Sequence, residues 1–429
     1  MESYNDIVVR RWIKEDPKAK CRNVTFQVTD DCCLKCSYCY QTHKGHRFMS
    51  KETAFQIVDL LFKMYDEDKE DAFINHHTKG IILDFIGGEP FMNIEVIEAT
   101  MEYFLNKCYE KDHIWLTNCR ASMSSNGVMY FDPKVQAFLN KYYRFVSLNI
   151  TIDGPKEIHD LCRVDYDGNG SFERAAAAWE DWLHKTNTRQ VNTKVTIAPE
   201  NLDKVDTIFD FFLEKGCIEI NANPVFEHKW TPEEASLYYK KLIILADKLL
   251  ANGATSNLFT ETIGRPMLMS ENNNWCGGTG AMLAFDPEGK AYPCLRYMES
   301  SLGTDREPII IGDTTGIYNT PETKKLYDSL NAVTRSSQST EECMTCHIAS
   351  GCAWCSAWNY QETGSYNKRS TNICWMHRAR TLANVYYWNK YYQLHKRPEN
   401  KPLYLSRDIA RKIITDEEYD KLYILSTRK

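Results

Sequence analysis

Short apolar runs alternate with helical patterns between residues 22 and 225, and this alternation constrains the fold more than any other feature. Six runs are predicted strands, at residues 23–29, 80–86, 114–124, 145–152, 190–198 and 217–223. Helical periodicity lies between them at residues 50–65, 94–107, 171–185 and 202–215. Such alternation predicts a parallel sheet with helices packed outside it. We therefore expect an α/β fold, an open partial (βα)6 barrel, with ligand sites at the C-terminal ends of its strands.

The chain has 429 residues, which is too long for one ordinary domain. We expect an N-terminal extension, the barrel, a helical bridge, a cysteine-rich domain with little regular structure and a helical tail, at residues 1–21, 22–230, 231–270, 271–380 and 381–429. The net charge of −6 gives no argument for nucleic-acid binding. No apolar run is long enough to span a membrane, and no signal peptide is visible. These features predict a cytoplasmic protein.

Sixteen cysteines are present, and a cytoplasmic setting keeps thiols reduced. Metal or cluster ligation and catalysis are therefore better interpretations than disulfides. Six are scattered and are expected to be inert core thiols: Cys21, Cys33, Cys108, Cys119, Cys162 and Cys217. The other ten fall into two spaced groups, one near the N-terminus and one after residue 275.

The first group has C-x3-C-x2-C spacing, at Cys32, Cys36 and Cys39. Iron–sulfur clusters normally take four cysteines, so three on one loop leave one iron of a [4Fe–4S] cluster open. The loop resembles that of the radical S-adenosylmethionine (SAM) superfamily, in which the open iron binds SAM and an electron from the cluster cleaves it. Cys33 offers an alternative C-x2-C-x2-C set; Cys32 is favoured because it preserves the family spacing. A zinc knuckle is the structural alternative.

Two further motifs follow predicted strands. Asp84-Phe-Ile-Gly-Gly-Glu-Pro90 resembles the Gly-Gly-Glu-Pro signature that holds the SAM amino group, which assigns Gly87, Gly88 and Glu89 to SAM. Glycines permit close backbone approach, and a carboxylate accepts strong hydrogen bonds from an ammonium. Ser124-Ser-Asn-Gly127 resembles the family motif whose Asn reaches the SAM ribose, which assigns Asn126.

Three more residues complete the implied SAM site. Tyr38 stands where the family places an aromatic side chain against the adenine. Thr151 and Arg163 match positions that pair with the SAM carboxylate, although the family usually carries Ser at the first. An Arg binds a carboxylate through two parallel hydrogen bonds. Alternatively, Arg163 forms a surface ion pair. His159 is expected to be a turn or capping residue.

The second cysteine group resembles the SPASM domain, which binds two auxiliary [4Fe–4S] clusters. Its members are Cys276, Cys294, Cys343, Cys346, Cys352, Cys355 and Cys374. The family usually has three residues between the last two cysteines of the central run, and this chain has two. A zinc ribbon is the rival interpretation, but it separates its knuckles by more residues and needs only four ligands.

The resemblance implies three [4Fe–4S] clusters in all. The outer auxiliary cluster would be bound by Cys343, Cys346, Cys352 and Cys374, and the inner one by Cys276, Cys294 and Cys355. Residues 277–282 offer no fourth cysteine for the inner cluster. We therefore expect an open iron there that binds a substrate thiolate.

The combined pattern implies an oxygen-sensitive radical SAM–SPASM oxidoreductase that matures a ribosomally synthesised peptide by joining Cys sulfur to carbon. In this scheme a 5′-deoxyadenosyl radical takes a hydrogen from the acceptor residue. Epimerisation or a carbon–carbon crosslink is an alternative on the same scaffold. Anaerobic sulfatase maturases carry Asp after the second auxiliary cysteine, and Leu295 stands there instead. A non-catalytic zinc or cluster scaffold is disfavoured by the nearly complete SAM motif set.

The expected partners are a precursor peptide with a leader and a flavodoxin or ferredoxin-type electron donor. With 31 residues before Cys32, a leader-binding domain is not expected at that end. A separate leader-binding protein, the basic segment around Arg10 and Arg11, and the outer face of the barrel remain alternatives. No side-chain base is assignable from the sequence.

Overall fold

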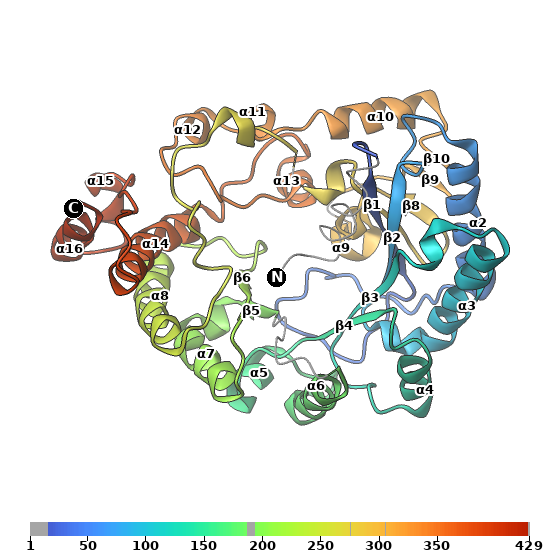
Figure 1. The fold of residues 1–429 in the computed structure, drawn as a ribbon, viewed down its shortest axis with the longest axis horizontal. Coiled ribbons are helices and arrows are strands. Elements are labelled where there is room, and N and C mark those ends of the chain that lie inside the picture. Colours follow the sequence, from blue (N-terminus) through green and yellow to red (C-terminus); the bar gives the residue numbers. More distant parts are fainter. Residues whose placement is uncertain (1–15, 187–193, 275, 305, 428–429) are drawn as a thin grey trace. The chain divides into compact units, whose positions relative to one another are not determined.

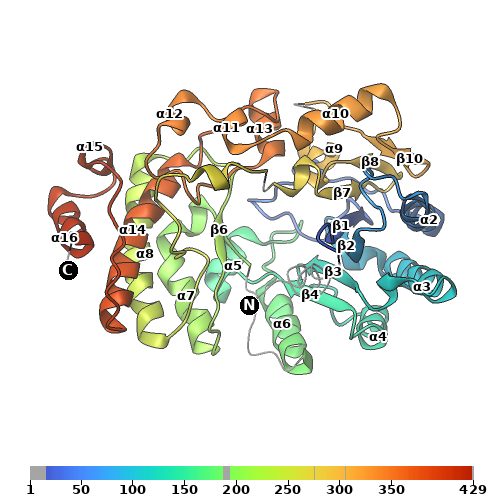
Figure 2. The ribbon, with the colours of Figure 1, turned by 45° about the horizontal axis from the view of Figure 1, so that its top comes forward.

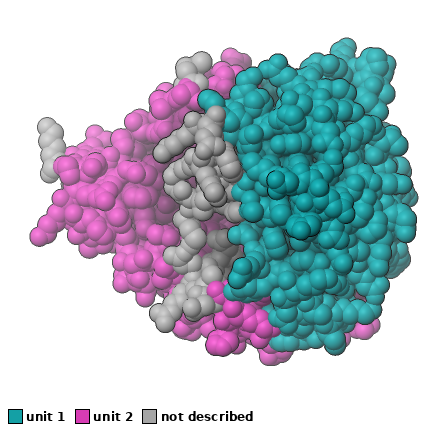
Figure 3. Space-filling view, turned by 45° about the vertical axis from the view of Figure 1, so that its right-hand side comes forward, with its two compact units in different colours: residues 1–33, 40–149, 274–333 teal, residues 34–39, 150–273, 334–429 magenta. Residues whose placement is uncertain are grey.

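The computed structural model describes residues 16–186, 194–274, 276–304 and 306–427. They form two compact units, coloured separately in Figure 3. The first comprises the described residues within 1–33, 40–149 and 274–333, and the second those within 34–39, 150–273 and 334–429. The domain boundaries predicted from the sequence stay a prediction, and residues 1–15 of the N-terminal extension, with Arg10 and Arg11, lie outside the described residues.

An eight-stranded sheet forms the centre of the first unit (Figure 1). Its order is β10-β9-β8-β7-β1-β2-β3-β4, where β1 is Lys20–Gln27, β2 Thr78–Ile86, β3 Cys119–Ser125, β4 Val146–Ile150, β7 Met282–Phe285, β8 Lys290–Tyr292, β9 Gly312–Asp313 and β10 Gly316–Ile317. Of the sheet's described residues, only Ile150, the last of β4, is assigned to the second unit. Strands β7, β1, β2 and β3 are parallel, and β8, β9 and β10 continue antiparallel. This confirms the α/β class with a mainly parallel sheet.

Buried apolar side chains of β1 and β2 form the core at the centre of this sheet. Val24 and Phe26 of β1 are fully buried, as are Leu83 and Phe85 of β2. The rings of Phe26 and Phe85 lie 5.3 Å apart between centroids. Parallel strands covered on both faces have such continuous apolar runs. Helices α2 (Lys51–Glu67), α3 (Ile94–Glu110) and α4 (Pro133–Lys141) lie along one side of β1–β4 (Figures 1 and 2).

The region after residue 270 contributes more regular structure than the sequence predicted. Strand β7 pairs with β1 in parallel register, from Asn23 opposite Met282 to Phe26 opposite Phe285. The helical elements of this region in the first unit are η5 (Gly277–Thr279), η6 (Leu295–Tyr297), α9 (Glu299–Leu302) and α10 (Pro321–Asn331). Strands of two to four residues carry too little periodicity to be recognised from sequence.

The predicted strand at residues 114–124 is wrong in its first part. A 3-10 turn, η2 (Ile114–Leu116), precedes β3, and the His113 side chain accepts from the Trp115 N–H at 3.2 Å. The Trp115 indole is fully buried and donates to the Thr78 carbonyl at 2.8 Å. The apolar residues of this stretch therefore fill the core beneath β2 instead of extending the strand.

Helices dominate the second unit. They are α5 (Lys156–Cys162), α6 (Phe172–Thr186), η3 (Pro199–Lys204), α7 (Val205–Glu214), α8 (Pro232–Asn252), η4 (Met269–Glu271), α11 (Arg335–Gln338), α12 (Glu341–Met344), α13 (Ser356–Thr363), α14 (Cys374–Leu394), α15 (Arg407–Ala410) and α16 (Asp416–Thr427). Helix α8 corresponds to the predicted helical bridge and packs along α14 (Figure 2). Among the described residues, no helix combines the length and apolarity needed to cross a bilayer.

The last two predicted strands are short and pair with each other. They are β5 (Val195–Ile197) and β6 (Ala222–Pro224), which are parallel; residues 190–193 of the predicted strand lie outside the described residues. In the part of the chain that is described, neither strand joins the eight-stranded sheet. The predicted strand at 217–223 starts too early because Thr255 exchanges backbone hydrogen bonds with Ile218 and Ile220.

Candidate functional site

The loop that follows β1 is anchored by two consecutive aspartates, Asp30 and Asp31. Asp31 Oδ1 accepts from the Cys32 N–H at 2.7 Å, and Cys32 is buried. Asp30 is also buried, and its carboxylate accepts from the Arg47 N–H and Nε at 2.7 and 2.6 Å. Charge-assisted pairs of this kind are stronger than neutral hydrogen bonds. The position of Cys32 is therefore fixed by its own loop.

Gly87 and Gly88 bring the end of β2 against this loop. A Cβ on Gly88 would lie 2.3 Å from the Asp31 carbonyl oxygen and 2.6 Å from the Cys32 Cβ. A Cβ on Gly87 would lie 2.7 Å from the Thr29 carbonyl oxygen. Both positions require glycine because backbone, which cannot rotate away, occupies the space. The predicted SAM glycines thus also hold the cysteine loop.

Glu89 joins the ends of β2 and β3. Its buried carboxylate accepts from the Ser125 hydroxyl at 2.8 Å, the Asn126 N–H at 2.7 Å and the Phe91 N–H at 3.2 Å. The structure therefore brings the predicted residues Glu89 and Asn126 together. Ser125 was missed by sequence reasoning, although it stands directly before Asn126 at a strand end.

The Asn126 amide points toward two thiols of the cysteine loop. Its Nδ2 lies 3.3 Å from Cys33 Sγ and 3.8 Å from Cys32 Sγ. A hydrogen bond from Cys32 lowers the pKa of the Cys33 thiol. Both cysteines are thus placed beside Asn126, and the preference for Cys32 stays a prediction.

Residues 34–39 belong to the second unit, where backbone bonds hold them against the end of α5. The Lys35 N–H donates to the Val164 carbonyl at 2.9 Å, and the Ser37 N–H to the Cys162 carbonyl at 3.0 Å. Cys36 and Cys39 are half-buried in this segment. The predicted triad is therefore divided between the two units, and its assembly with Cys32 stays a prediction.

Tyr38, Asp153 and Arg163 form a polar cluster in this second unit. The Tyr38 hydroxyl donates to Asp153 Oδ2 and accepts from Arg163 Nη1 at 2.8 Å. Asp153 Oδ1 accepts from the Thr196 N–H of β5 at 3.0 Å. Burial raises the pKa of the Tyr38 phenol and of the Asp153 carboxyl. Sequence reasoning gave Asp153 no role, although a carboxylate directly after the predicted strand at residues 145–152 was the available signal.

Arg163 is a buried arginine with one hydrogen-bond donor left unused in the described part of the chain. Its Nε has no hydrogen-bond partner among the residues that the structure describes. Unpaired buried donors are costly and uncommon. The alternative of a surface ion pair for Arg163 is therefore wrong. Thr151, which is half-buried, lies two residues before Asp153.

His159 connects both ends of this cluster. The Asp153 N–H donates to His159 Nδ1 at 3.3 Å, so the ring proton is on Nε2, which donates to Ser171 Oγ at 3.0 Å. The Ser171 hydroxyl in turn donates to the Arg163 carbonyl at 2.9 Å. Burial lowers the pKa of His159 to about 3. A neutral imidazole therefore holds both residues.

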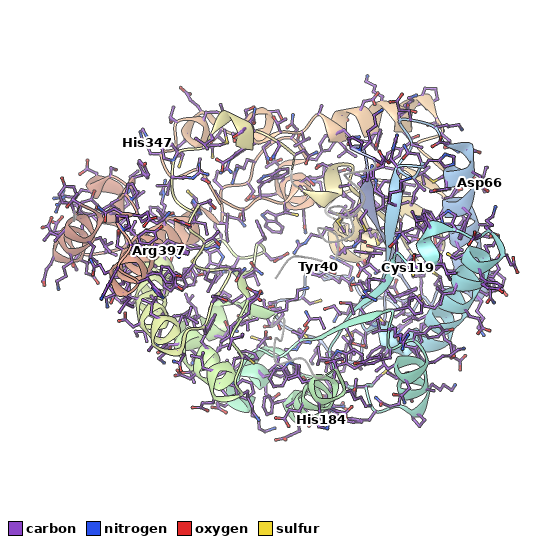
Figure 4. All side chains as sticks on the ribbon, in the orientation of Figure 1. Tyr40, Asp66, Cys119, His184, His347 and Arg397 are labelled. Atoms are coloured by element: carbon purple, nitrogen blue, oxygen red, sulfur yellow. The ribbon has the colours of Figure 1, made fainter. Side chains whose placement is uncertain are left out.

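Two of the predicted auxiliary ligands lie in the first unit. Cys276 precedes η5, and the buried Cys294 precedes η6. The carbonyl of Leu295 accepts from the Ser301 hydroxyl at 3.1 Å. The Arg296 guanidinium lies 4.7 Å from the ring centroid of Tyr40, which Figure 4 labels.

The remaining auxiliary cysteines lie in the second unit. Cys343 is in α12, and the N–H of Cys346 donates to its carbonyl at 3.3 Å. Cys355 caps α13, and Cys374 begins α14, where burial raises its pKa to about 12. Cys352 is half-buried beside Arg369, whose Nη2 lies 3.0 Å from its sulfur. No three His, Cys, Asp or Glu side chains within the described ranges surround a single metal-ion position.

Comparison with known proteins identifies relatives of this chain. Residues 21–171 match the family model of the 4Fe-4S single cluster domain. The chain is 22% identical over 314 residues to the radical SAM cyclopropyl synthase TigE of Paramaledivibacter caminithermalis, an alignment that covers 68% of this chain and 61% of the relative. It is 24% identical over 286 residues to a cysteine-type anaerobic sulfatase-maturating enzyme of Clostridium perfringens, which covers 62% of this chain and 72% of the relative.

A solved structure has the same fold. Native anSMEcpe with bound AdoMet and Cp18Cys peptide superposes with a TM-score of 0.61 at 19% identity, covering 85% of this chain and 97% of that one. The strands that carry Cys32, Glu89 and Asn126 belong to the parallel part of the sheet described above. The chain is therefore homologous to a radical SAM cyclopropyl synthase and to anaerobic sulfatase maturases, carries a region that matches the 4Fe-4S single cluster domain, and shares the fold of anSMEcpe.

Proposed function

We propose that this enzyme matures a ribosomally synthesised peptide by joining the sulfur of a peptide cysteine to a carbon of another residue. The observation that carries the proposal is Leu295, which follows Cys294 in η6 where the sulfatase-maturase pattern has Asp. A thiol loses its proton when it binds a metal, so a thiolate on an open iron needs no side-chain base. Leu295 in place of the Asp that would act as a base is therefore compatible with thioether formation.

The residues of each unit fit the proposed SAM site. In the first unit, Glu89, Asn126 and the two glycines form a fixed edge beside Cys32. In the second, the unpartnered Nε of Arg163 suits the SAM carboxylate, with Thr151 nearby in sequence and Tyr38 holding the guanidinium. When bound at Cys32, Cys36 and Cys39, the cluster would supply the electron that converts SAM into a hydrogen-abstracting radical.

Two auxiliary clusters complete the proposed cofactors, which makes three [4Fe–4S] clusters. Cys276, Cys294 and Cys355 would hold the inner one with an open iron for the substrate thiolate, and the outer one would take Cys343, Cys346, Cys352 and Cys374. The second set consists of four thiols, as closed clusters require. A leader-bearing peptide, a flavodoxin or ferredoxin-type donor and a cytoplasmic, oxygen-free setting are part of the proposal. That anSMEcpe was solved with AdoMet and a peptide supports it.

Co-expression with cysteine-containing peptides encoded by neighbouring reading frames tests the proposal. Thioether formation is expected to remove two hydrogens per crosslink and to protect the cysteine from alkylation. A Cys32→Ala variant, which lacks a cluster ligand, is the control and should leave the peptide unmodified. Loss of two hydrogens with the thiol still alkylated would overturn sulfur-to-carbon bonding.

Two relatives favour specific alternatives. The cyclopropyl synthase favours carbon–carbon bond formation, which would leave the cysteine thiol free. The cysteine-type sulfatase maturase favours oxidation of cysteine to an aldehyde, which a carbonyl-reactive probe would detect. Epimerisation would leave the mass unchanged in normal water and add deuterium in heavy water.

A further inference from the structure

Two buried arginines of the second unit lack an acidic partner. Arg369 is 6% exposed and Arg335 is 7% exposed. No carboxylate in the described part of the chain lies within ion-pair distance of either guanidinium. Glu271 attracts Arg335 electrostatically, but its carboxylate forms an ion pair with Arg265 at 2.7 Å. Burial of an unpaired charge is strongly unfavourable unless another group compensates it. Both sites therefore need an anion.

The group that Arg369 does contact is a predicted cluster ligand. One nitrogen, Nη2, lies 3.0 Å from Cys352 Sγ and also donates to the carbonyls of Cys352 and Ala353 at 3.1 and 2.9 Å. Arg335 is attracted by the sulfurs of Cys352 and Cys346 and repelled by Arg369. The Arg369 guanidinium thus contacts this cysteine set, and Arg335 lies close enough for its charge to act on it.

Arg369 is held in this place by a rigid polar network. Its N–H donates to the Gln338 carbonyl at 2.9 Å, and the Gln338 side chain accepts from Asn359 Nδ2 at 2.8 Å. The Asn359 side-chain oxygen Oδ1 accepts from the N–H of Ser370, the residue after Arg369, at 2.9 Å. Arg378 differs, because its guanidinium pairs with the exposed Glu342 at 3.0 Å and lies over the Trp375 ring.

We propose that Arg369, assisted by Arg335, raises the reduction potential of an outer cluster bound by Cys343, Cys346, Cys352 and Cys374. A [4Fe–4S] cluster with four thiolates is negatively charged, and it gains one more negative charge on reduction. Nearby positive charge and hydrogen bonds to sulfur therefore stabilise the reduced form, as they do in iron–sulfur proteins generally. The inference rests on the proposed function, which places a cluster at these cysteines.

The test is a potentiometric titration of the full chain, reconstituted anaerobically with iron and sulfide and followed by electron paramagnetic resonance. A Cys32→Ala/Cys36→Ala/Cys39→Ala background removes the radical-generating cluster, and the outer signal is assigned by its loss in Cys352→Ala. Arg369→Met should move the midpoint to a more negative potential. A tenfold loss of reduced cluster at a fixed potential corresponds to about 59 mV for one electron.

Matched variants separate charge from folding. Arg369→Lys keeps the charge but not the planar donors, so its midpoint should lie between parent and Arg369→Met. Arg335→Met should shift the midpoint in the same direction. Arg378→Met should shift it less, because pairing with the exposed Glu342 offsets part of a charge that also acts on Cys374 and Cys346. These shifts would support the proposal even if Arg369→Met fails to bind iron.

Two results would overturn the inference, and they differ in what they imply. Full iron content with parent-like midpoints in Arg369→Lys and Arg335→Met would reject the role of the arginines and leave the proposed function intact. Iron content too low for an outer cluster in the parent would reject both the inference and the three-cluster proposal.

Discussion

Replacement of Glu89 by Gln tests whether one carboxylate holds the edge of the proposed SAM site. Glu89 Oε1 accepts from Ser125 and Phe91, and Oε2 accepts from the Asn126 N–H. Gln keeps the shape and one carbonyl oxygen, which is expected at the Oε1 position because two donors meet there. Its NH2 group then faces the Asn126 N–H, donor against donor.

The cost of this substitution follows from the three contacts. Loss of one hydrogen bond to a charged group costs about 1.5–3 kcal/mol, and an unpaired buried N–H adds about 1–3 kcal/mol. Some relaxation of the loop at Asn126 is expected, so the total is about 2–5 kcal/mol. For a unit of this size each kcal/mol lowers the melting midpoint by roughly 2–4 °C. We therefore expect a fall of several degrees.

Hydrogen exchange locates the effect, and thermal unfolding measures it. In Glu89→Gln, the amides around Asn126 should exchange faster, while those of α8 should be unchanged. Ser125→Ala is the matched control, since the carboxylate keeps both N–H donors. Its loss is about 1–3 kcal/mol, because the Ser125 hydroxyl also accepts from the Gly127 N–H at 3.0 Å. SAM binding by the reconstituted enzyme should weaken more in Glu89→Gln than in Ser125→Ala.

The unfolding temperatures of Glu89→Gln and Ser125→Ala, together with amide exchange at Asn126, decide whether the Glu89 carboxylate holds the loop. If Glu89→Gln unfolds at the same temperature as Ser125→Ala, with unchanged exchange at Asn126, the carboxylate does not hold the loop. The argument that Glu89 positions Asn126 would then be refuted, whatever happens to SAM binding.

Three further predictions concern other parts of the molecule. Cys32→Ala should lose the iron and the SAM-dependent spectral change of the first cluster while Cys33→Ala keeps both, and the reverse result would show that Cys33 is the ligand. Because burial lowers the pKa of His159 to about 3, below the unfolded value of about 6.5, the unfolded chain binds the extra proton and stability falls as the pH drops between these values. His159→Gln should therefore lose less stability between pH 7 and 5 in urea titrations, and parallel pH profiles would contradict this. Asp30→Asn, which removes the buried partner of Arg47, should lower the free energy of unfolding by about 1–3 kcal/mol, and an unchanged urea midpoint would count against it.

Much of the fold was predictable because long periodic segments are fixed by burial. The prediction located strands β1 to β4 and the helical bridge that contains α8, all of which bury apolar side chains. It failed at residues 114–118, where an apolar run packs as a turn around the buried Trp115. It also missed β7, a four-residue strand, because its pairing with β1 depends on residues more than 250 positions away. Tertiary pairing, which periodicity does not record, decides such elements.

The candidate site was predictable where motif spacing is strict and less so where contacts are long-range. Glu89 and Asn126 were named from motifs, and the structure joins them. Nothing local marks Asp153 as the partner of Tyr38, because 115 residues separate them. The same limit applies to Arg369, which meets Cys352 only after the chain has turned back on itself.

The neutral state of His159 explains how Asp153 and Arg163 are held without weakening the site. Its imidazole accepts from the Asp153 backbone and, through Ser171, reaches the Arg163 carbonyl. A cation at this position would repel the Arg163 guanidinium and compete with it for Asp153. An apolar residue would leave the Asp153 N–H unpaired inside the protein. The buried neutral ring avoids both costs, and Arg163 keeps its charge and its unpartnered Nε for an anionic ligand. A residue that the sequence marked as a turn former thus determines the electrostatics of the proposed SAM site.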